Sequence, residues 1–584
     1  MTARRTFLTI LLVYLLLAIA YSVAQPLGEA PDEADHYAYV RYLGLNRQLP
    51  AGPEVTQSKH PPLYHAAAAA LTFWTGLDFD FLRSNPDAFP LGGGSAPPNF
   101  FVHTTLESFP WRGGALAMHL GRLLSVLLGA VTVWVTWRLG RELFPERAEV
   151  GLLAAAFLAG LPGFLYIAGA MSNDNAAAAF GSLALLLLAQ ALRRGASWKR
   201  SLGLGLVFGL GLLSKVGTLA LWPLAIVALA GAFWPQRRQP RAWLLAAGHA
   251  GLAWGLGLLV ASPWLLRNWR LYGDPMGWSL VRATVDQRPG PLTGADLVWL
   301  SRGLFTYFWG RFGPIGQVRY PAPLYILCGL LSLLLALGAV HYLRRLLPRE
   351  PRAIFGVLLL AAAPGLVILS IVQYSTIALG TDQARLMWPA IAAIAGWVGL
   401  GVAGGAHRFR LPAPALVPGF IGLMGAFGLA VLLFVLRPAF APGLLLSADA
   451  AAAQPPLATF GEGLELLAAE LPVEPLAAGE PLPLRLLWRA RMPLSADLRP
   501  VVRLVHEDGW LAAEWDHSPA QGRFATDRWQ PGQVVADPYQ LHPNPTGPGL
   551  YRVLVGVRPF RGDWLFPTPP ASDPFVMLGT VTYQ

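Results

Sequence analysis

The chain has 584 residues, of which 54% are hydrophobic and only 13% are charged. Its apolar residues come in long blocks, a pattern that excludes a soluble globular protein and indicates a membrane protein with many spans. The formal net charge is +11, but the basic residues sit in short clusters between the apolar runs. We therefore expect no nucleic-acid partner, and we interpret the positive charge as a signal of membrane topology.

About eleven apolar runs are long enough to cross a bilayer, and we expect them to contact membrane lipids. Basic clusters such as Arg4-Arg5, Arg193-Arg194 and Arg237-Arg238 fall at alternate connections between the runs, as in cytoplasmic loops. The pattern predicts a multi-pass protein of the cell (plasma) membrane with a cytoplasmic N-terminus and an exoplasmic C-terminal domain. The predicted spans are residues 6–24, 115–137, 149–170, 175–192, 200–214, 217–234, 242–263, 322–343, 354–373, 388–404 and 415–436.

A polar, carboxylate-rich segment, residues 25–65, follows the first span directly. Pro31 and the acids after it predict a helix that starts at Asp32 and Glu33, with Glu33 and Tyr37 in one row. Four other side chains are spaced to share a face: Asp32, Asp35, His36 and Tyr39. Two carboxylates and an imidazole on one face can perform acid–base chemistry or bind a cation. The alternative is a solvated, acid-capped helix on the membrane surface.

The second polar motif is Lys59-His60-Pro61-Pro62-Leu63-Tyr64-His65. Its two prolines fix an extended turn and prevent a helix, and Tyr64 and His65 open the next apolar stretch. A lysine, two histidines and a tyrosine at a membrane surface can hold a phosphate or pyrophosphate by charge-assisted hydrogen bonds. An ordinary interfacial turn, with Lys59 extending its ammonium group into water, is the alternative.

Further polar groups lie in the other predicted outer loops. Asn173 and Asp174 fall between two spans, where they can cap the next helix, help to bind a divalent cation or orient an acceptor. Several basic residues lie at outer ends of spans, against the cytoplasmic bias, and an anionic lipid head group would explain them. These are Lys215, Arg267, Arg270 and Arg385. The alternative is extension of the charged group into water, above all for Arg270, and Arg385 could instead pair with Asp382.

The last part of the chain changes pattern. Residues 438–480 are rich in Pro, Ala and Gly and predict a linker and a first strand. From Pro481, six short alternating runs bounded by turn residues predict an exoplasmic β-sandwich over 481–584. Residues 1–437, with a large first exoplasmic loop at 25–114, then form the transmembrane domain. Five aromatic residues of the sandwich could stack on sugar rings or pack in its core: Trp510, Trp515, Trp529, Tyr539 and Trp564.

Two observations on the sequence argue against an ATP-driven pump and a serine hydrolase. Gly203-x-Gly205 with Gly209-x-Gly211 looks like a nucleotide loop, but it lies in an apolar span, where small residues permit close helix packing. The sequence contains no Walker loop, zinc-ligand spacing or Gly-x-Ser-x-Gly motif. We therefore expect no nucleotide cofactor, and neither an ATP-driven pump nor a serine hydrolase is indicated.

An Asp-Glu pair after the first span, Asp32-Glu33, followed by the turn His60-Pro61-Pro62-Leu63-Tyr64, resembles the GT-C membrane glycosyltransferases. More specifically it is similar to the group that uses dolichyl- or undecaprenyl-phosphate sugars, which includes protein O-mannosyltransferases and aminoarabinose transferases. The resemblance covers roughly residues 1–436. Its other pieces include Gly121-Arg122-Leu123-Leu124-Ser125, Ser172-Asn173-Asp174, Leu213-Ser214-Lys215 and Gln383-Ala384-Arg385.

The resemblance implies a polytopic α-helical GT-C fold and inverting transfer of a hexose or pentose from a polyprenyl-phosphate donor. The acceptor would be an envelope glycan, lipid or protein on the outer face of the membrane. Asp32 would be the general base and Glu33 its catalytic partner, and Asp32 and Asp174 could share a divalent metal such as Mg²⁺ or Mn²⁺. The implied donor-phosphate contacts are Lys59, His60, Lys215, Arg267 and Arg385. The implied acceptor and second-loop residues are His36, Tyr64, Asn173 and Asp174.

The chain departs from the protein O-mannosyltransferases in two ways. An extra residue precedes the histidine in Asp32-Glu33-Ala34-Asp35-His36, and the predicted sandwich is not their β-trefoil. Two other functions stay open. A transporter or flippase for lipid-linked sugars needs ionisable residues along a path through the bilayer, and the predicted mid-span regions are almost free of charge. A non-enzymatic glycan-binding scaffold predicts that the outer-loop acids and bases lie apart in space.

Overall fold

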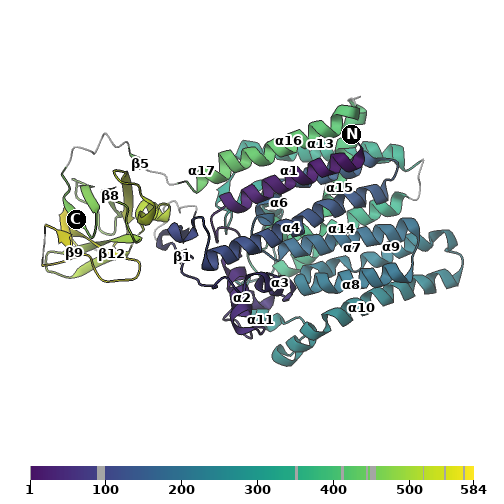
Figure 1. Cartoon of the computed structure of the whole chain (residues 1–584), viewed down its shortest axis with the longest axis horizontal. Coiled ribbons are helices and arrows are strands. Elements are labelled where there is room, and N and C mark those ends of the chain that lie inside the picture. Colours follow the sequence, from purple (N-terminus) through teal and green to yellow (C-terminus); the bar gives the residue numbers. More distant parts are fainter. Residues whose placement is uncertain are drawn as a thin grey trace. The chain divides into compact units, whose positions relative to one another are not determined.

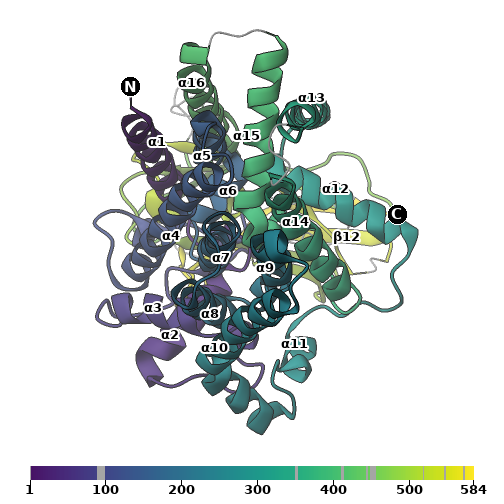
Figure 2. The same ribbon diagram turned by 90° about the vertical axis from the view of Figure 1, so that its right-hand side faces the viewer.

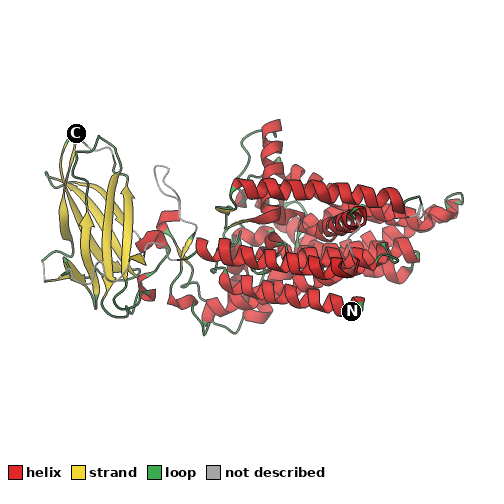
Figure 3. Cartoon of the chain, turned by 90° about the horizontal axis from the view of Figure 1, so that it is seen from above, coloured by secondary structure: helices red, strands yellow, loops and turns green. Residues whose placement is uncertain are grey.

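The structure is a computed structural model that describes residues 2–88, 99–348, 353–409, 413–441, 445–446, 455–516, 518–544, 547–569 and 572–584. The chain divides into two compact units. The helical unit comprises Met1–Gln25, Ala30–Leu77 and Leu116–Arg437, and the β unit comprises Pro26–Glu29, Asp78–Ala115 and Pro438–Gln584. The long helices belong to the first unit and the large sheets to the second (Figure 3).

Nine helical segments in the described part of the chain are long and apolar enough to cross a membrane. A tenth is the pair α5 (Ala148–Gly160) and α6 (Pro162–Ala168), which bends by 64°. The nine are α1 (Ala3–Ala24), α4 (Gly113–Leu143), α7 (Asp174–Arg194), Val216–Gln236 with α9 (Leu224–Phe233), α10 (Pro240–Tyr272), α13 (Ala322–Leu346), α14 (Ala353–Ser375), Ala384–Arg408 with α15 (Ile391–Arg408), and Ala415–Ala439 with most of α16 (Ala413–Val431).

These helices confirm the polytopic membrane fold, but the count of about eleven spans is not confirmed. Every predicted span coincides with a helical segment, but one of these segments is broken and another is short. The range 149–170 is broken before Pro162, because proline has no backbone N–H to continue the helix. The range 200–214 forms α8 (Trp198–Ser214), whose 17 residues span only about 25 Å.

The polar segments between the spans form short helices. They are α2 (Glu33–Asn46), η1 (Thr56–Lys59), α3 (Leu63–Thr72), α11 (Trp278–Thr284) and α12 (Gly294–Gly310), followed by the hairpin of β3 (Arg311–Phe312) and β4 (Val318–Arg319). Helices α2, α3 and α11 lie at the same end of the helical unit (Figures 1 and 2). α2 packs on α3 and η1, and η1 packs on α11. The first polar segment and the loop after α10 therefore meet at one end of the spans.

Two antiparallel sheets build the β unit. One has the order β10-β9-β12-β14 and the other β13-β6-β7-β8-β11-β5. Buried side chains from both sheets, including Trp488, Val502 and Tyr551, form one hydrophobic cluster, which confirms the predicted sandwich. The strands are β5 (Leu445–Leu446), β6 (Ala458–Phe460), β7 (Leu464–Glu470), β8 (Leu482–Ala490), β9 (Leu498–His506), β10 (Leu511–Asp516), β11 (Val534–Leu541), β12 (Gly549–Pro559), β13 (Pro567–Thr568) and β14 (Val576–Tyr583).

The β unit also recruits part of the first outer loop. Its segment 78–115, with β1 (Arg83–Ser84) paired to β2 (Phe101–Val102), groups with the C-terminal strands. Asn85 donates from Nδ2 to the Gln521 carbonyl at 3.0 Å. Among the predicted sugar-stacking aromatics, Trp529 and Tyr539 are buried in the sandwich core, whereas Trp510 is exposed. The range predicted as a linker and one strand, 438–480, contains β5, β6 and β7.

Glycines of α8 face α10 at close range. A Cβ atom on Gly209 would lie 2.5 Å from Cβ of Val260 and 2.9 Å from the Gly257 carbonyl oxygen. The glycine pattern of this span is therefore a packing surface, because small residues let helix backbones approach closely in a membrane. Gly203, on the same helix, would meet only one atom, at 4.0 Å.

We predict that Gly209→Leu lowers the free energy of unfolding by about 1–3 kcal/mol, because the added side chain overpacks the contact between α8 and α10. Thermal unfolding of the purified protein in detergent measures the effect. Gly203→Leu adds the same side chain to the same helix without a close neighbour, so it serves as the matched control. Equal losses for the two variants would contradict the assigned contact.

Candidate active site

Arg385 is the centre of a charged cluster in the helical unit. It lies in η6 (Ala384–Ala390), and its side chain is only 10% exposed. Its guanidinium donates from Nη2 to Oδ2 of Asp32 at 2.5 Å and from Nη1 to Oδ2 of Asp174 at 2.9 Å. Arg385 thus joins two carboxylates that are 142 positions apart in sequence. Asp382, the other partner considered for Arg385, instead lies 3.7 Å from Nη1 of Arg311.

Asp174 anchors the cluster to the second outer loop. It is the first residue of α7, and its side chain is fully buried. Nζ of Lys215 donates to its Oδ1, and the Ser172 hydroxyl donates to its Oδ2 at 3.0 Å. Asn173 occupies the N-cap position, but its side chain makes no capping hydrogen bond and donates from Nδ2 to the Ser214 carbonyl. The predicted second-loop acid therefore has an electrostatic role in addition to starting a helix.

Asp32 is the accessible carboxylate of the cluster, with a side chain that is 40% exposed. It precedes α2 with φ of 60° and ψ of 9°, in the left-handed region that aspartate tolerates better than most residues. Its side chain makes no cap hydrogen bond, so the predicted role as a helix cap is replaced by the contact with Arg385. Desolvation raises the pKa of Asp32, but the charge and hydrogen bond of Arg385, together with His36 and Lys59, outweigh it and hold this pKa below its usual range.

Three histidines lie beside the cluster. A hydrogen bond of 2.9 Å joins Nδ1 of His36 and Nε2 of His65, and the rings of His36 and His60 lie 6.1 Å apart. Burial lowers the pKa of His36 to about 3 and the pKa of His60 and His65 well below the usual value. These imidazoles are therefore neutral at pH 7 and can donate or accept hydrogen bonds. Nε2 of His36 is buried and has no hydrogen-bond partner among the described residues.

Lys59 supplies a further cation from η1. Its Nζ donates to the Thr284 carbonyl at 3.1 Å, which ties η1 to the end of α11. Burial lowers the pKa of Lys59, and the neighbouring carboxylates of Asp32 and Asp35 offset part of this effect. The motif containing Lys59 and His60 therefore lies close enough to Asp32 for their charges to interact.

Three other predicted site residues make contacts elsewhere. Glu33 is fully buried in a bidentate ion pair with Arg122, at 2.7 Å for both hydrogen bonds, and also accepts from the Met171 backbone N–H at 2.8 Å. The Tyr64 hydroxyl lies 2.8 Å from the Ser125 hydroxyl. Arg267 donates to the carbonyls of Leu49 and Pro50. The polar groups of Glu33, Tyr64 and Arg267 are thus engaged by the protein itself, and their expected roles stay predictions.

Sequence reasoning assigned no role to Arg122. Its side chain is fully buried in α4, and it also donates from Nη1 to the carbonyls of Ser22 and Gln25. The clamp of Glu33 and Arg122 thus joins the end of α1, the start of α2, α4 and the loop before α7. An ionisable residue within an apolar run is costly unless it is paired, so the position of Arg122 was the available signal.

The cluster does not fit a metal site. Within the described ranges, no group of three or more His, Cys, Asp or Glu side chains is arranged to hold a metal ion. Asp32 and Asp174 are bridged by the guanidinium of Arg385, and Lys215 occupies the other oxygen of Asp174. Cationic side chains therefore stand where a shared metal would have to bind, and we derive no step through a metal.

Comparison with known proteins gives one family match. The sequence model of the dolichyl-phosphate-mannose-protein mannosyltransferase family matches residues 116–266. No curated protein matches the chain.

Several solved structures are similar at low scores. An Archaeoglobus fulgidus oligosaccharyltransferase tethered with an acceptor peptide has a TM-score of 0.38 and 13% identity, over 74% of this chain and 54% of that one. The S. cerevisiae protein O-mannosyltransferase Pmt1-Pmt2 complex bound to its sugar donor gives 0.33 and 15%, over 51% and 35%. ArnT from Cupriavidus metallidurans bound to undecaprenyl phosphate gives 0.32 and 14%, over 80% and 81%. The chain spans about half the length of the oligosaccharyltransferase.

The described part of the chain thus has many candidate membrane spans, and part of them is similar in sequence to a family of membrane-embedded mannosyltransferases. The match covers residues 116–266 of the 584, and it is of the kind that the motifs around Asp32 and His60 led us to expect. The matched range contains Arg122, Asp174 and Lys215, whereas Asp32 and Arg385 lie outside it. The structure therefore joins the matched part of the chain to residues that the family model does not reach.

We predict that Arg122→Met lowers the free energy of unfolding by about 3–5 kcal/mol, because it leaves the Glu33 carboxylate buried without its cation. The double variant Arg122→Met with Glu33→Met removes both charges, so it is expected to lose less stability than the single variant. Thermal unfolding of the purified protein in detergent measures both changes.

The exposed pair of Arg194 and Glu142 gives the control for this prediction. The Arg194 side chain is 51% exposed, and Arg194→Met is expected to change the free energy of unfolding by less than about 1 kcal/mol. A double variant that is less stable than Arg122→Met alone would show that the clamp does not act through its buried charges.

Proposed function

We propose that the protein transfers a sugar from a polyprenyl-phosphate donor to an acceptor of the cell envelope, with inversion at the anomeric carbon. The observation that carries the proposal is the double contact of Arg385 with Asp32 and Asp174. It gathers a partly exposed carboxylate, two cations and neutral imidazoles at one place, which a scaffold with dispersed polar loops would not need. The family match names a mannosyl donor on a dolichyl phosphate, so a polyprenyl-phosphate sugar is the donor class that we adopt.

The proposed reaction is a single displacement. The acceptor hydroxyl oxygen attacks the anomeric carbon of the donor, and the bond from that carbon to the phosphate oxygen breaks. Asp32 accepts the hydroxyl proton, and the polyprenyl phosphate leaves with the bonding electron pair. Arg385, Lys215 and Lys59 stabilise the additional negative charge on the leaving phosphate, and His60 and His36 supply neutral hydrogen-bonding groups.

The charges of the cluster match this scheme. In contact with one another, Asp32 and Asp174 balance Arg385 and Lys215. When Asp32 takes up a proton, one cation is left without an opposing carboxylate at the moment when the phosphate gains charge. The positive field therefore strengthens in the transition state relative to the ground state, which is the condition for catalysis by electrostatic stabilisation.

Because Arg385 contacts Asp32, binding of the donor can also activate Asp32 as the base. While Arg385 pairs with Asp32, the lowered pKa makes this carboxylate a weak proton acceptor. A donor phosphate that draws Arg385 and Lys215 toward itself weakens the pairing, so the pKa of Asp32 rises when the donor is bound. In this scheme Asp174 and the clamp of Glu33 and Arg122 position the reacting groups and exchange no proton.

The proposed orientation follows from the basic clusters of the sequence. Arg4 and Arg5 face the cytoplasm, and the ends of the spans that carry Asp32, Asp174 and Arg385 face the exoplasmic side. The β unit is exoplasmic and the protein is in the cell membrane. An acceptor glycan, lipid or protein then reaches Asp32 from the aqueous side, while the polyprenyl chain stays in the bilayer.

We predict that Asp32→Asn lowers the rate of transfer by about a hundredfold to ten-thousandfold, because the amide cannot accept the hydroxyl proton. The assay supplies purified protein with polyprenyl-phosphate sugars and an extract of cell-envelope acceptors. Glu54→Gln, which removes an exposed carboxylate from the same loop, is the control and is expected to retain wild-type transfer. Transfer by Asp32→Asn at the wild-type rate would remove Asp32 from the role of base.

We also predict a change in pH dependence for Arg385→Gln. In the wild type the pKa of Asp32 is lowered, so kcat/KM for the free enzyme keeps its value well into the acid range. Without the guanidinium the pKa of Asp32 rises, so the acid limb of the profile shifts to higher pH. The variant is also expected to have a higher KM for the donor, because a phosphate contact is lost.

Arg270→Gln is the control for this second prediction, because Arg270 is an exposed arginine at the end of α10. It is expected to leave both the acid limb and the donor KM unchanged. An Arg385→Gln enzyme whose acid limb coincides with that of the wild type would contradict the proposed coupling of Arg385 and Asp32.

A further inference from the structure

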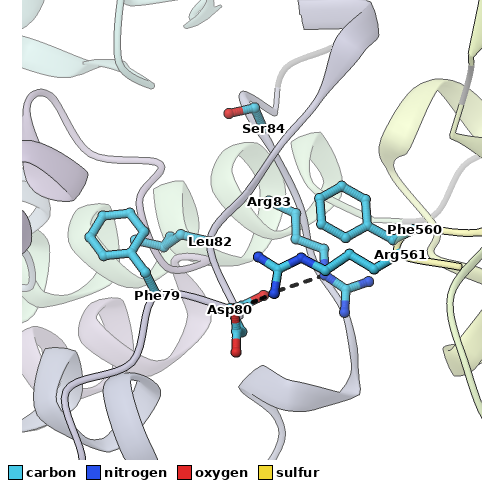
Figure 4. Close-up of a pocket in the computed structure, with 7 residues that line it drawn as sticks. All are labelled: Phe79, Asp80, Leu82, Arg83, Ser84, Phe560 and Arg561. Atoms are coloured by element: carbon cyan, nitrogen blue, oxygen red, sulfur yellow. Dashed lines mark hydrogen bonds and ion pairs between the residues drawn. The ribbon is translucent and has the colours of Figure 1, made fainter.

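A pocket of about 270 Å³ lies entirely within the β unit. One wall comes from residues 79–84, which lead into β1, and the other from Phe560 and Arg561, which follow β12 (Figure 4). Asp497 fixes this arrangement, because its backbone carbonyl accepts from the Phe560 N–H at 3.1 Å. Its carboxylate accepts from Nη1 of Arg83 at 3.4 Å.

Three guanidinium groups surround the ring of Phe560. Arg499, Arg83 and Arg561 place their guanidinium carbons 4.3, 4.7 and 5.9 Å from the ring centroid. Arg83 and Arg561 line the pocket, and Arg499 packs on the same ring while remaining 7% exposed. An aromatic ring stabilises nearby cations through its negative face, but it supplies no hydrogen-bond acceptors in the plane of a guanidinium.

The nearby acids do not supply a hydrogen-bond acceptor for every donor of these guanidinium groups. Arg561 pairs with the exposed Asp80 at 3.1 Å, as the dashed line in Figure 4 shows. Among the described residues, the ion-pair partner of Arg499 is Oδ1 of Asp516, which lies 3.8 Å from its Nη1 and therefore beyond hydrogen-bond distance. Its Nε and Nη2 are buried without a hydrogen-bond partner in the described part of the chain. The positive charge of Arg499 is therefore only partly offset by its neighbours, and it adds to the attraction of the adjoining pocket for an oxyanion.

We propose that this pocket binds an oxyanion, a carboxylate or a phosphate, carried by a sugar residue. Arg83 and Arg561 bind the anion, and the positive charge of Arg499 at the Phe560 ring adds to the attraction. The rest of the lining includes Leu82, Ser84 and the exposed Phe79. The volume of about 270 Å³ lies just below the usual range of ligand pockets, about 300–1,000 Å³. The pocket is therefore large enough for a single residue of a glycan. The site does not depend on which sugar the helical unit transfers.

The experiment measures binding to the full-length protein in detergent by isothermal titration calorimetry. The probes are glucuronate, glucose 6-phosphate, inorganic phosphate and methyl glucoside. We expect glucuronate or glucose 6-phosphate to bind, methyl glucoside not to bind, and the tighter of the two acids to identify the anion. Binding of methyl glucoside as tight as that of the acids, or binding of inorganic phosphate alone, would overturn the proposal.

Variants locate the binding in the pocket. Arg83→Gln and Arg561→Gln are each expected to weaken binding by about tenfold, the size of one lost charged hydrogen bond. Arg552→Gln, on an exposed position of β12, is the matched control and is expected to leave the affinity unchanged. Equal weakening in Arg552→Gln, or unchanged affinity in both pocket variants, would also overturn the proposal.

A variant that is expected to bind the ligand more tightly gives a further test, because a misfolded variant would bind it less tightly. Asp80 is 60% exposed and competes with the ligand for Arg561. Asp80→Asn removes this competing carboxylate, so it is expected to tighten the binding of the acidic sugar about threefold. Weaker binding by a variant that melts at the wild-type temperature would contradict the assignment of Arg561 to the anion.

Discussion

The ion pairs of Arg385 are the interaction on which the candidate site depends. Three of the four charged groups in direct contact, Asp174, Lys215 and Arg385, are at most 10% exposed, so each pays a desolvation cost that only its partners can offset. Arg385 contacts both carboxylates and Lys215 contacts Asp174, so the four groups together carry no net charge. The network also explains why four segments far apart in the sequence converge, since each supplies a charge that is unfavourable when buried alone.

The adjacent acids Asp32 and Glu33 have different partners, because the backbone directs their side chains to different places. Glu33 begins α2 and points into the fold, where Arg122 and the Met171 N–H bind both of its oxygens. Asp32, one residue earlier, adopts the left-handed conformation, and its side chain reaches Arg385 instead of capping the helix. Backbone strain of this kind persists where surrounding contacts hold it, and the Glu33 clamp provides such contacts directly beside Asp32.

Much of this protein could be predicted from its sequence, because long apolar runs and short alternating runs report directly on spans and strands. The motifs containing Asp32, Lys59, His60, Asp174, Lys215 and Arg385 were also recognisable, since charges at outer span ends require a reason. The different settings of Asp32 and Glu33 were not predictable, because helical periodicity gives adjacent residues no information about tertiary partners. The grouping of residues 78–115 with the C-terminal strands depends on long-range contacts such as Asn85 to Gln521, which no local pattern encodes.

The balanced charge of the site has a consequence for how a substrate binds. A free cationic pocket would attract any anion, including the phosphates of abundant membrane lipids, whereas here Arg385 and Lys215 are already in contact with carboxylates. An anion gains only the difference between its own contacts and those it displaces, so charge alone supplies little affinity. Selectivity must therefore come from groups that an ordinary lipid phosphate does not engage. The buried Nε2 of His36 lacks a partner among the described residues, and a sugar hydroxyl can satisfy it in either tautomer of the ring, because a hydroxyl both donates and accepts hydrogen bonds.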